Sequence, residues 1–188
     1  MNKTAIIVVD MIYDFTNPHG KIFYPINSSL ISKIHDFVEE ARQYGCLIIY
    51  VAHTVQANDL AKRIKPTREC CIEGTGGELI DERLHVDIQQ DIIIKKTKYS
   101  AFFDTSLRST LTKYAIDQIV VVGTKTNNCI LATVIDAYNY NIKTFVPREL
   151  VGTNDEITNV IYLRDMDKYL CEVESETTIL DKIKRGIL

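Results

Sequence analysis

Short runs of β-branched residues alternate along this chain with longer amphipathic stretches, and this alternation restricts the possible folds more than any other feature. It is typical of βα units, in which helices join parallel strands and cover both faces of one sheet. The predicted strands are residues 5–9, 47–52, 92–95, 119–122, 144–146 and 171–174. The predicted helices after the first are residues 105–114, 130–140, 157–169 and 176–184. The sequence therefore predicts an α/β fold, a doubly wound, Rossmann-like three-layer domain with a six-stranded, mostly parallel sheet.

The first helix has recognisable ends. Ser28 or Ser29 is a candidate N-cap, and Gly45 follows the last apolar position of the amphipathic stretch. Residues 58–73 show weak periodicity, so we expect a loop there with one helical turn at most. No linker rich in proline, glycine or serine interrupts the chain, and residues 1–188 are predicted to form a single domain.

Composition argues against several classes of function. The 22 basic and 25 acidic residues form no basic stripe, so neither nucleic acid nor an anionic membrane is an expected partner. The first apolar run has five residues, which is too short for a signal-peptide core or a membrane span. Five cysteines without a Cys-x-x-Cys pair indicate a reducing compartment, and we expect a cytoplasmic protein.

Three reactive side chains stand where ligand sites of open α/β sheets are found, at the carboxyl ends of predicted strands. Asp10 closes the first strand, Lys96 ends the third, and Cys129 falls on the first turn of the helix after the fourth. Each has a purely structural explanation when taken alone. Asp10 could cap a turn, Lys96 could belong to a solvated run of lysines, and Cys129 could be a small core residue.

Taken together, the three side chains suit nucleophilic attack on a carbonyl carbon. A helix N-terminus and a nearby ammonium both favour the thiolate form of a cysteine, and the same N–H groups can hold a developing oxyanion. Asp10 would accept the thiol proton, while Lys96 holds the thiolate and the carboxylate together by charge.

The residues around this triad resemble three motifs of one known family. Residues 10–15 are similar to its Asp-Met-x-x-Asp-Phe motif, residues 96–102 to Lys-x-Arg-Tyr-Ser-Ala-Phe, and residues 123–129 to Gly-x-x-Thr-Asn-x-Cys. Two shorter matches lie at residues 74–78 and 136–138. The chain thus resembles the isochorismatase-like cysteine hydrolases, which include nicotinamidases, N-carbamoylsarcosine amidase and amidohydrolases of ureido groups.

The resemblance implies roles for individual residues. Asp10, Lys96 and Cys129 would be catalytic, and the backbone N–H groups of Lys125 and Cys129 would bind the oxyanion. A cis peptide bond would join Thr124 to Lys125. The reaction would release ammonia or an amine and leave a thioester, which water then hydrolyses.

Four further residues are expected to contact the substrate: Phe15, His53, Tyr99 and Thr126. Phe15 and Tyr99 lie within the matching motifs, and His53 follows the second predicted strand. The alternatives are core packing for the aromatic residues and a buried position behind the pocket for His53.

A metal site is not expected. The nicotinamidases of the family bind a divalent ion through an Asp-x-His pair and a later histidine, whereas this chain has His53 without the aspartate and Cys70 at the later position. Two ligands do not fill a zinc site, which usually takes three or four from the protein, so no metal and no cofactor is predicted. The other histidines, His19, His35 and His85, are expected to be solvated surface residues without partners.

The sequence therefore favours a cysteine-dependent amidohydrolase that cleaves a C–N bond of a small amide, N-carbamoyl or ureido substrate. Nicotinamidase or isochorismatase activity remains an alternative within the family, and a catalytically silent scaffold is an alternative of another class. The resemblance also implies a homodimer or homotetramer.

Overall fold

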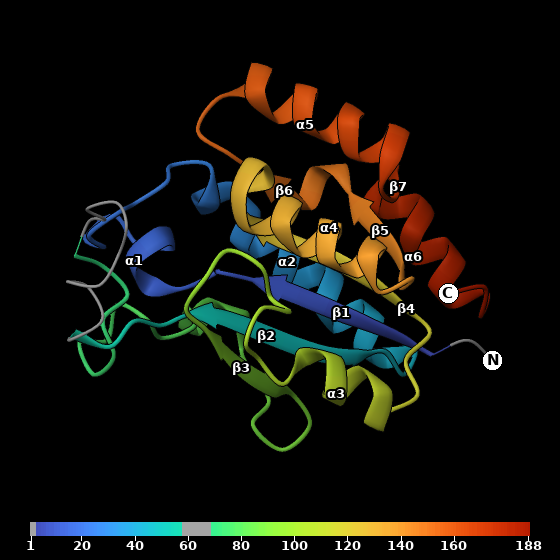
Figure 1. Ribbon diagram of the computed structural model, residues 1–188, viewed down its shortest axis with the longest axis horizontal. Coiled ribbons are helices and arrows are strands. Elements are labelled where there is room, and N and C mark those ends of the chain that lie inside the picture. Colours follow the sequence, from blue (N-terminus) through green and yellow to red (C-terminus); the bar gives the residue numbers. More distant parts are fainter. Residues whose placement is uncertain (1–2, 58–68) are drawn as a thin grey trace.

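A parallel sheet of seven strands runs through the middle of the protein (Figure 1). The structure is a computed structural model that describes residues 3–57 and 69–188. Its strands are β1 (Thr4–Val9), β2 (Leu47–His53), β3 (Ile92–Lys96), β4 (Gln118–Thr124), β5 (Lys143–Pro147), β6 (Val151–Gly152) and β7 (Glu172–Glu174). Their order is β3-β2-β1-β4-β5-β7, β6 pairs with β4, and all the described pairs are parallel. The predicted α/β class and parallel sheet are confirmed.

Strand β1 occupies the centre because it is apolar along almost its whole length. All six of its residues are buried, as expected for a strand that is covered on both faces. Its partners are β2 on one side and β4 on the other. Gly123 of β4 lies opposite Val9, and a Cβ atom at this glycine would come within 2.1 Å of the Val9 carbonyl oxygen. The close approach of β1 and β4 therefore requires glycine at this position.

Helices cover both faces of the sheet, as Figure 1 shows. One face packs against α2 (Asn27–Gln43) and α6 (Glu176–Lys184), and the other against α3 (Leu107–Lys113) and α4 (Leu131–Asn139). Helix α5 (Glu156–Tyr169) lies outside α4 and buries only Met166. The short elements are α1 (Tyr13–Thr16), the 3₁₀ turns η2 (Glu82–Leu84) and η4 (Arg148–Leu150), and the π-turn η3 (Thr126–Ile130). None of the described helices is long and apolar enough to cross a membrane.

The predicted helices and strands are present in the structure, with small differences at their ends and one additional strand. The four later helices match within two residues at each end. The sheet gains a seventh strand, β6, which was not predicted because two residues give no periodic signal. The segment 58–68 lies outside the described residues, whereas residues 69–73 form no helix or strand.

The predicted N-cap of the first helix is wrong. Helix α2 begins at Asn27, ahead of Ser28 and Ser29, and its N-cap Ile26 offers no side-chain oxygen. A turn fixes this start: the Asn27 N–H donates to the Tyr24 carbonyl over 2.9 Å, and the Asn27 side chain donates to the Phe15 carbonyl over 2.9 Å. Tertiary contacts thus override the serine signal. The other end is as predicted, since Gly45 follows the helix with φ +80°.

The expectation that His35 and His85 have no partners is also wrong. Their rings contact each other edge to face, with centroids 4.7 Å apart, and His35 is half-buried. Both residues lie on elements that pack together, α2 and the end of η2, which the sequence pattern could not place side by side. His19 is exposed, as expected.

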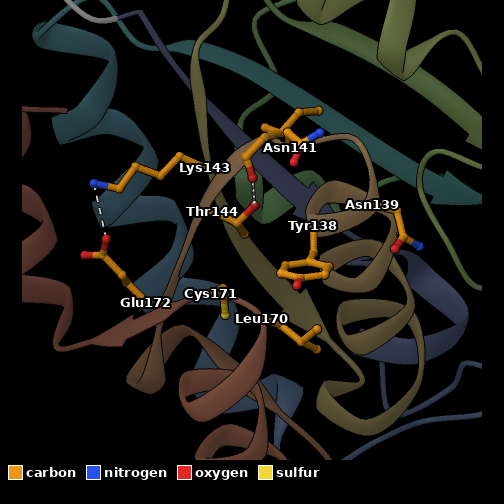
Figure 2. Close-up of a pocket in the computed structure, with 9 residues that line it drawn as sticks. Tyr138, Asn139, Asn141, Lys143, Thr144, Leu170, Cys171 and Glu172 are labelled. Atoms are coloured by element: carbon orange, nitrogen blue, oxygen red, sulfur yellow. Dashed lines mark hydrogen bonds and ion pairs between the residues drawn. The ribbon is translucent and has the colours of Figure 1, made fainter.

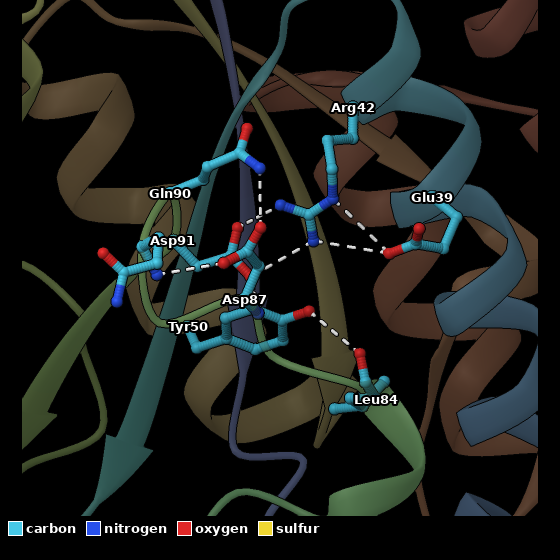
Figure 3. A network of polar contacts seen from close by, with 8 residues as sticks. Glu39, Arg42, Tyr50, Leu84, Asp87, Gln90 and Asp91 are labelled. Carbon is cyan, nitrogen blue, oxygen red and sulfur yellow. Dashed lines mark hydrogen bonds and ion pairs between the residues drawn. The ribbon is translucent and has the colours of Figure 1, made fainter.

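A polar network ties α2 to the start of β3 (Figure 3). The Arg42 guanidinium contacts both carboxylate oxygens of Asp91, and its Nη2 atom lies 3.1 Å from Oδ2. The same Asp91 oxygen accepts the Asp87 N–H over 2.8 Å. The Asp91 side chain is almost fully buried, so the arginine compensates a charge that would otherwise be costly. This network fixes the beginning of the strand that ends at Lys96.

Candidate active site

The three predicted catalytic side chains meet at the carboxyl edge of the sheet. Asp10 directly follows β1, Lys96 is the last residue of β3, and Cys129 lies in η3 after β4. The Lys96 Nζ atom is 2.7 Å from Asp10 Oδ2 and 3.5 Å from Cys129 Sγ. The residues are 0%, 1% and 9% exposed, in the order Asp10, Lys96, Cys129. The lysine therefore bridges the acid and the thiol in a site that is almost closed to water.

The backbone holds Asp10 in place. Asp10 has φ +57°, a left-handed conformation that aspartate tolerates better than most residues. Its own N–H donates to the Val51 carbonyl over 2.9 Å, and its Oδ1 atom accepts the His53 N–H over 2.9 Å. One carboxylate oxygen is thus bound to β2, which leaves the other for Lys96.

The Lys96 ammonium has three neighbours in fixed positions. Besides Asp10 and Cys129, it donates to the Lys98 carbonyl over 3.0 Å. A fully buried lysine is costly unless its charge is paired and its N–H groups are bonded, and here both conditions hold. The side chain is therefore held in one place between the two reactive groups.

Cys129 lies in a π-turn and not, as predicted, in the first turn of an α-helix. The Ile130 N–H donates to the Lys125 carbonyl over 3.1 Å, a spacing of five residues, and α4 begins only at Leu131. The Cys129 carbonyl accepts the Thr133 hydroxyl over 2.7 Å, and that hydroxyl accepts the Ala101 N–H over 3.0 Å. The widened turn and the segment after Lys96 are thus joined through one threonine. Single π-turns within helices are frequent at functional sites.

The electrostatic environment keeps the resting thiol protonated. Burial raises the pKa of Cys129 to about 12, the Asp10 carboxylate adds to the rise, and the Lys96 ammonium opposes it. Burial alone lowers the pKa of Lys96, but Asp10 and Cys129 raise it more, so the net shift is upward. The sequence predicts that a helix N-terminus and the ammonium favour the thiolate form, but in the structure desolvation and a neighbouring carboxylate outweigh the cation. Asp10 and Lys96 thus form a close pair beside a thiol that keeps its proton at neutral pH.

Directly before this turn, the peptide bond between Thr124 and Lys125 is cis. The roles of the Lys125 and Cys129 N–H groups as oxyanion donors stay predictions. Lys125 also contributes a side-chain contact that was not expected: its Nζ atom lies 5.0 Å from the centre of the Tyr24 ring. Tyr24 in turn packs against Phe15, with ring centroids 5.3 Å apart. An aromatic pair therefore lies next to the cysteine turn.

The four predicted substrate contacts have different surroundings. Phe15 is buried, His53 is half-buried beside Asp10, and Tyr99 is 61% exposed. Thr126 is completely buried, and its hydroxyl donates to Asn159 Oδ1 of α5 over 2.7 Å. Thr126 thus connects η3 to α5. The roles of Phe15, His53, Tyr99 and Thr126 in binding stay predictions.

Two supporting residues were not predicted. Asn159 holds Thr126 from an element far along the chain, and no local pattern in the sequence marks it. Asp14 is buried and accepts the Cys71 N–H over 2.6 Å and the Lys21 N–H over 3.1 Å. Gly77 lies against the same carboxylate, since a Cβ atom there would be 2.3 Å from Asp14 Oδ2. The second aspartate of the Asp-Met-x-x-Asp-Phe match was a signal for Asp14, which proves to be an anchor for the loop after residue 69.

No set of metal ligands comes together among the residues that the structure describes. Within residues 3–57 and 69–188, no group of three histidine, cysteine or carboxylate side chains is placed to bind one. Cys70 is buried beside Cys71, which is also buried, whereas the His53 N–H donates to Asp10 Oδ1.

A cavity of about 630 Å³ lies at the opposite, amino edge of the sheet between α4 and β7 (Figure 2). None of the triad residues lines it.

Comparison with known proteins decides the family. The model of the isochorismatase domain matches residues 4–178. The chain belongs to the isochorismatase family. An Arabidopsis thaliana relative in this family, named "Probable inactive nicotinamidase At3g16190", is 35% identical over 147 residues, which are 72% of each chain. N-carbamoylsarcosine amidase of Arthrobacter sp. is 26% identical over 190 residues, or 95% of this chain and 70% of that protein.

The fold of this isochorismatase-family chain also matches solved structures. The crystal structure of a cysteine hydrolase from Pseudomonas syringae pv. phaseolicola superposes with a TM-score of 0.87 over 98% of this chain and 93% of that one, at 22% sequence identity. At this identity the likeness establishes the isochorismatase-like fold and nothing further.

Proposed function

We propose that the protein is a metal-independent cysteine amidohydrolase that cleaves a C–N bond in a small amide, with N-carbamoyl and ureido compounds as the leading substrates. The observation that carries this proposal is the position of Lys96 Nζ, 2.7 Å from Asp10 Oδ2 and 3.5 Å from Cys129 Sγ. An acid, a cation and a thiol in direct contact, all buried, have the arrangement that covalent catalysis by a cysteine requires.

The first half of the reaction transfers an acyl group to sulfur. As Cys129 Sγ attacks the carbonyl carbon, its proton moves to the Asp10 carboxylate, and the carbonyl electron pair moves to the oxygen. The backbone N–H groups of Lys125 and Cys129 are the proposed donors to this oxyanion. When the intermediate collapses, the C–N bond breaks and Asp10 returns its proton to the departing nitrogen, which leaves as ammonia or an amine.

The second half restores the enzyme. Asp10 accepts a proton from water while the water oxygen attacks the acyl carbon, the C–S bond breaks, and the proton returns to sulfur. The Lys96 ammonium stays charged throughout and stabilises the sulfur anion whenever it is the leaving group. The high resting pKa of Cys129 fits this scheme, because a protonated thiol needs Asp10 as its base.

The substrate class rests on two supports. One is the similarity to an N-carbamoylsarcosine amidase across 95% of this chain. The other is the surroundings of His53. In the described part of the chain, His53 lacks the further ligands that would complete a metal site like that of the metal-binding nicotinamidases. Isochorismate cleavage breaks a vinyl ether and makes no use of a cysteine nucleophile.

An ammonia-release screen tests the proposal. The purified protein is supplied with N-carbamoyl amino acids, ureido acids, biuret and nicotinamide, and each reaction is repeated with Cys129→Ala. We expect turnover on an N-carbamoyl or ureido compound that Cys129→Ala abolishes, together with an acyl adduct on Cys129 in intact-mass spectra. Turnover that survives in Cys129→Ala would contradict the mechanism.

A silent scaffold is the second candidate, and one observation favours it: the Arabidopsis relative with 35% identity carries the word "inactive" in its name. A scaffold would give no turnover with any compound of the screen and no acyl adduct at Cys129. Alkylation of Cys129 by iodoacetamide would then change no measured activity.

We also propose that the protein works in the cytoplasm as a homodimer or homotetramer. All five cysteines are free in the structure, which agrees with a reducing compartment. The exposed apolar residues of α5, described below, support self-association. Size determination by light scattering and the localisation of a tagged chain test these two statements.

A further inference from the structure

A groove on the sheet lies away from the triad and is assigned no part in the proposed reaction. Side chains alternate between the two faces of a strand, so Ala52, Ile93 and Lys95 face away from the side on which Lys96 and Cys129 meet. These residues line a groove of about 320 Å³ together with Thr54 and with five residues of the segment 78–88, namely Glu78, Leu79, Ile80, Val86 and Ile88. The volume is within the range of small-molecule sites.

The groove is lined mainly by apolar side chains that solvent reaches. Leu79, Ile88 and Ile93 are 60%, 78% and 50% exposed. Its inner wall contains Ala52 and Thr54, which are both buried, and the Thr54 hydroxyl already donates to the Ala52 carbonyl over 3.3 Å. Three large exposed apolar residues around one concave surface indicate a binding surface for an apolar group.

One carboxylate in the lining has an oxygen without a donor. Glu78 is 7% exposed, and its Oε1 atom accepts the Gly74 N–H over 2.7 Å. Its Oε2 atom is buried and has no hydrogen-bond partner among the residues that the structure describes. A buried polar atom without a partner is costly, so this position favours a ligand that brings a donor.

The cation at the rim does not satisfy Glu78. The Lys95 Nζ atom pairs with Glu73 Oε1, and the other Glu73 oxygen accepts the Gln56 side chain. The rim pair is thus neutral as a whole, and the groove combines apolar walls with one uncompensated carboxylate. We propose that it binds a small amphiphilic cation, an alkylammonium whose nitrogen donates to Glu78 Oε2 and whose aliphatic chain lies against Ile88 and Ile93.

Titration with hexylammonium chloride tests this site. Calorimetry or amide chemical shifts should show saturable binding of one molecule per chain, with shifts centred on residues 78–95. Hexanol has the same chain without the charge and should bind at least about tenfold more weakly, since a hydrogen bond to a charged group contributes about 1.5–3 kcal/mol. Hexanoate should not bind, because it would place a second carboxylate beside Glu78.

Substitutions separate the polar and apolar contributions. Glu78→Gln should weaken hexylammonium binding about tenfold or more while leaving hexanol binding unchanged. Ile93→Ser should weaken both compounds, and it keeps the buried carboxylate intact if Glu78→Gln fails to fold. Ile187→Ser is the matched control, because Ile187 is 47% exposed, lies after α6 and does not line the groove. It should bind like the wild type.

Several outcomes would overturn the proposal: no saturable binding of hexylammonium, equal affinity for hexanol, or wild-type affinity in both Glu78→Gln and Ile93→Ser. The result does not depend on the proposed amidohydrolase activity, since Cys129→Ala should bind hexylammonium like the wild type. Failure of the ammonia-release screen would leave the groove unaffected.

Discussion

Lys96 is a charged residue that water does not reach, and its burial is tolerated only because of its neighbours. Removing one member of a buried ion pair typically costs about 3–5 kcal/mol, because the remaining charge is left without compensation. The Asp10–Lys96 pair lies 2.7 Å apart, with both side chains fully buried. Both the stability of the fold and the proposed reaction therefore depend on Asp10 and Lys96. Variants of these two residues should change the free energy of unfolding as well as kcat.

We expect Lys96→Met to lower the free energy of unfolding by about 3–5 kcal/mol, since the Asp10 carboxylate then stays buried without a cation. Asp10→Asn should reduce kcat by about 10²–10⁴, the usual contribution of a general base.

The double variant Asp10→Asn/Lys96→Met should lose less unfolding free energy than the sum of the losses in the two single variants. Urea denaturation of the four proteins measures this coupling, and additive losses would contradict a direct pair.

The raised pKa of Cys129 predicts a stability that depends on pH. A cysteine in the unfolded chain titrates near its ordinary value of about 9, whereas the folded thiol holds its proton until about 12. Above pH 9 the folded state therefore binds more protons, and the unfolding free energy should fall as pH rises, by up to about 1.4 kcal/mol per unit for this one group.

Cys129→Ala isolates this contribution from those of the other buried cysteines. Urea denaturation between pH 8 and 10.5 should show a steeper alkaline loss of stability in the wild type than in the variant. Parallel curves would show that Cys129 titrates alike in the folded and unfolded chain.

At the scale of elements, the π-turn η3 is held by α5. The Thr126 hydroxyl and the Asn159 side chain form the contact between them, and Thr126 is buried while Asn159 is half-buried. We expect Asn159→Ala to destabilise the protein by about 1–3 kcal/mol, because it leaves the buried hydroxyl without a partner, and Thr126→Ala by about 0.5–1.5 kcal/mol, the net contribution of one hydrogen bond. The double variant should lose less than the sum.

Turnover should also fall in these variants under conditions in which they remain folded, because the turn that carries Cys129 is no longer fixed. Thr112→Ala is a matched control: its hydroxyl donates to the Arg108 carbonyl on the exposed surface of α3. This control should change neither unfolding nor turnover. Unchanged turnover in Thr126→Ala would show that the contact plays no part in positioning the cysteine.

The close approach of β1 and β4 predicts that Gly123 cannot be replaced without a large loss of stability. Gly123→Ala should cost about 3 kcal/mol or more, because the new Cβ atom meets the Val9 carbonyl oxygen and the residue has φ +118°. Gly45→Ala should cost only about 1–2 kcal/mol, since its φ is +80° but nothing lies within 4 Å. Thermal unfolding compares the two, and equal losses would rule out the steric argument.

These elements also show how far sequence reasoning reaches. The apolar runs predicted β1 to β5 because buried parallel strands need continuous hydrophobic residues, and the motifs indicated that Asp10, Lys96 and Cys129 share one site. The sign of the Cys129 shift could not be predicted, since it depends on burial and on a carboxylate from a distant strand. The same holds for Asn159, whose partner is 33 residues away.

At the scale of the whole molecule, α5 presents an apolar face that the described part of the chain leaves uncovered. Ile157, Val160 and Ile161 are 75%, 54% and 42% exposed, at a spacing that places them on one side of the helix. Its only buried residue is Met166. Such a stripe is typical of surfaces that another chain covers.

We expect light scattering at micromolar concentration to give the mass of a dimer or a tetramer. Ile157→Asp/Ile161→Asp should shift the protein to the monomer, because a charge in an apolar interface is costly. Tyr44→Asp is the control, an exposed aromatic residue just after α2, and should keep the wild-type mass. A wild-type monomer would refute self-association, and an intact oligomer in the double variant would place the interface elsewhere.

The central position of β1 affects how the chain is made. On the ribosome this strand emerges before both of its partners, and it can pair with β2 once residues 47–53 have followed. Its other edge stays open until β4, residues 118–124, has been synthesised. The chain between residues 53 and 118 takes several seconds to make at about 5–20 residues per second, and during this time an apolar strand edge is available to other nascent chains. Expression truncated before residue 118 should therefore yield inclusion bodies, whereas the full chain closes that edge itself.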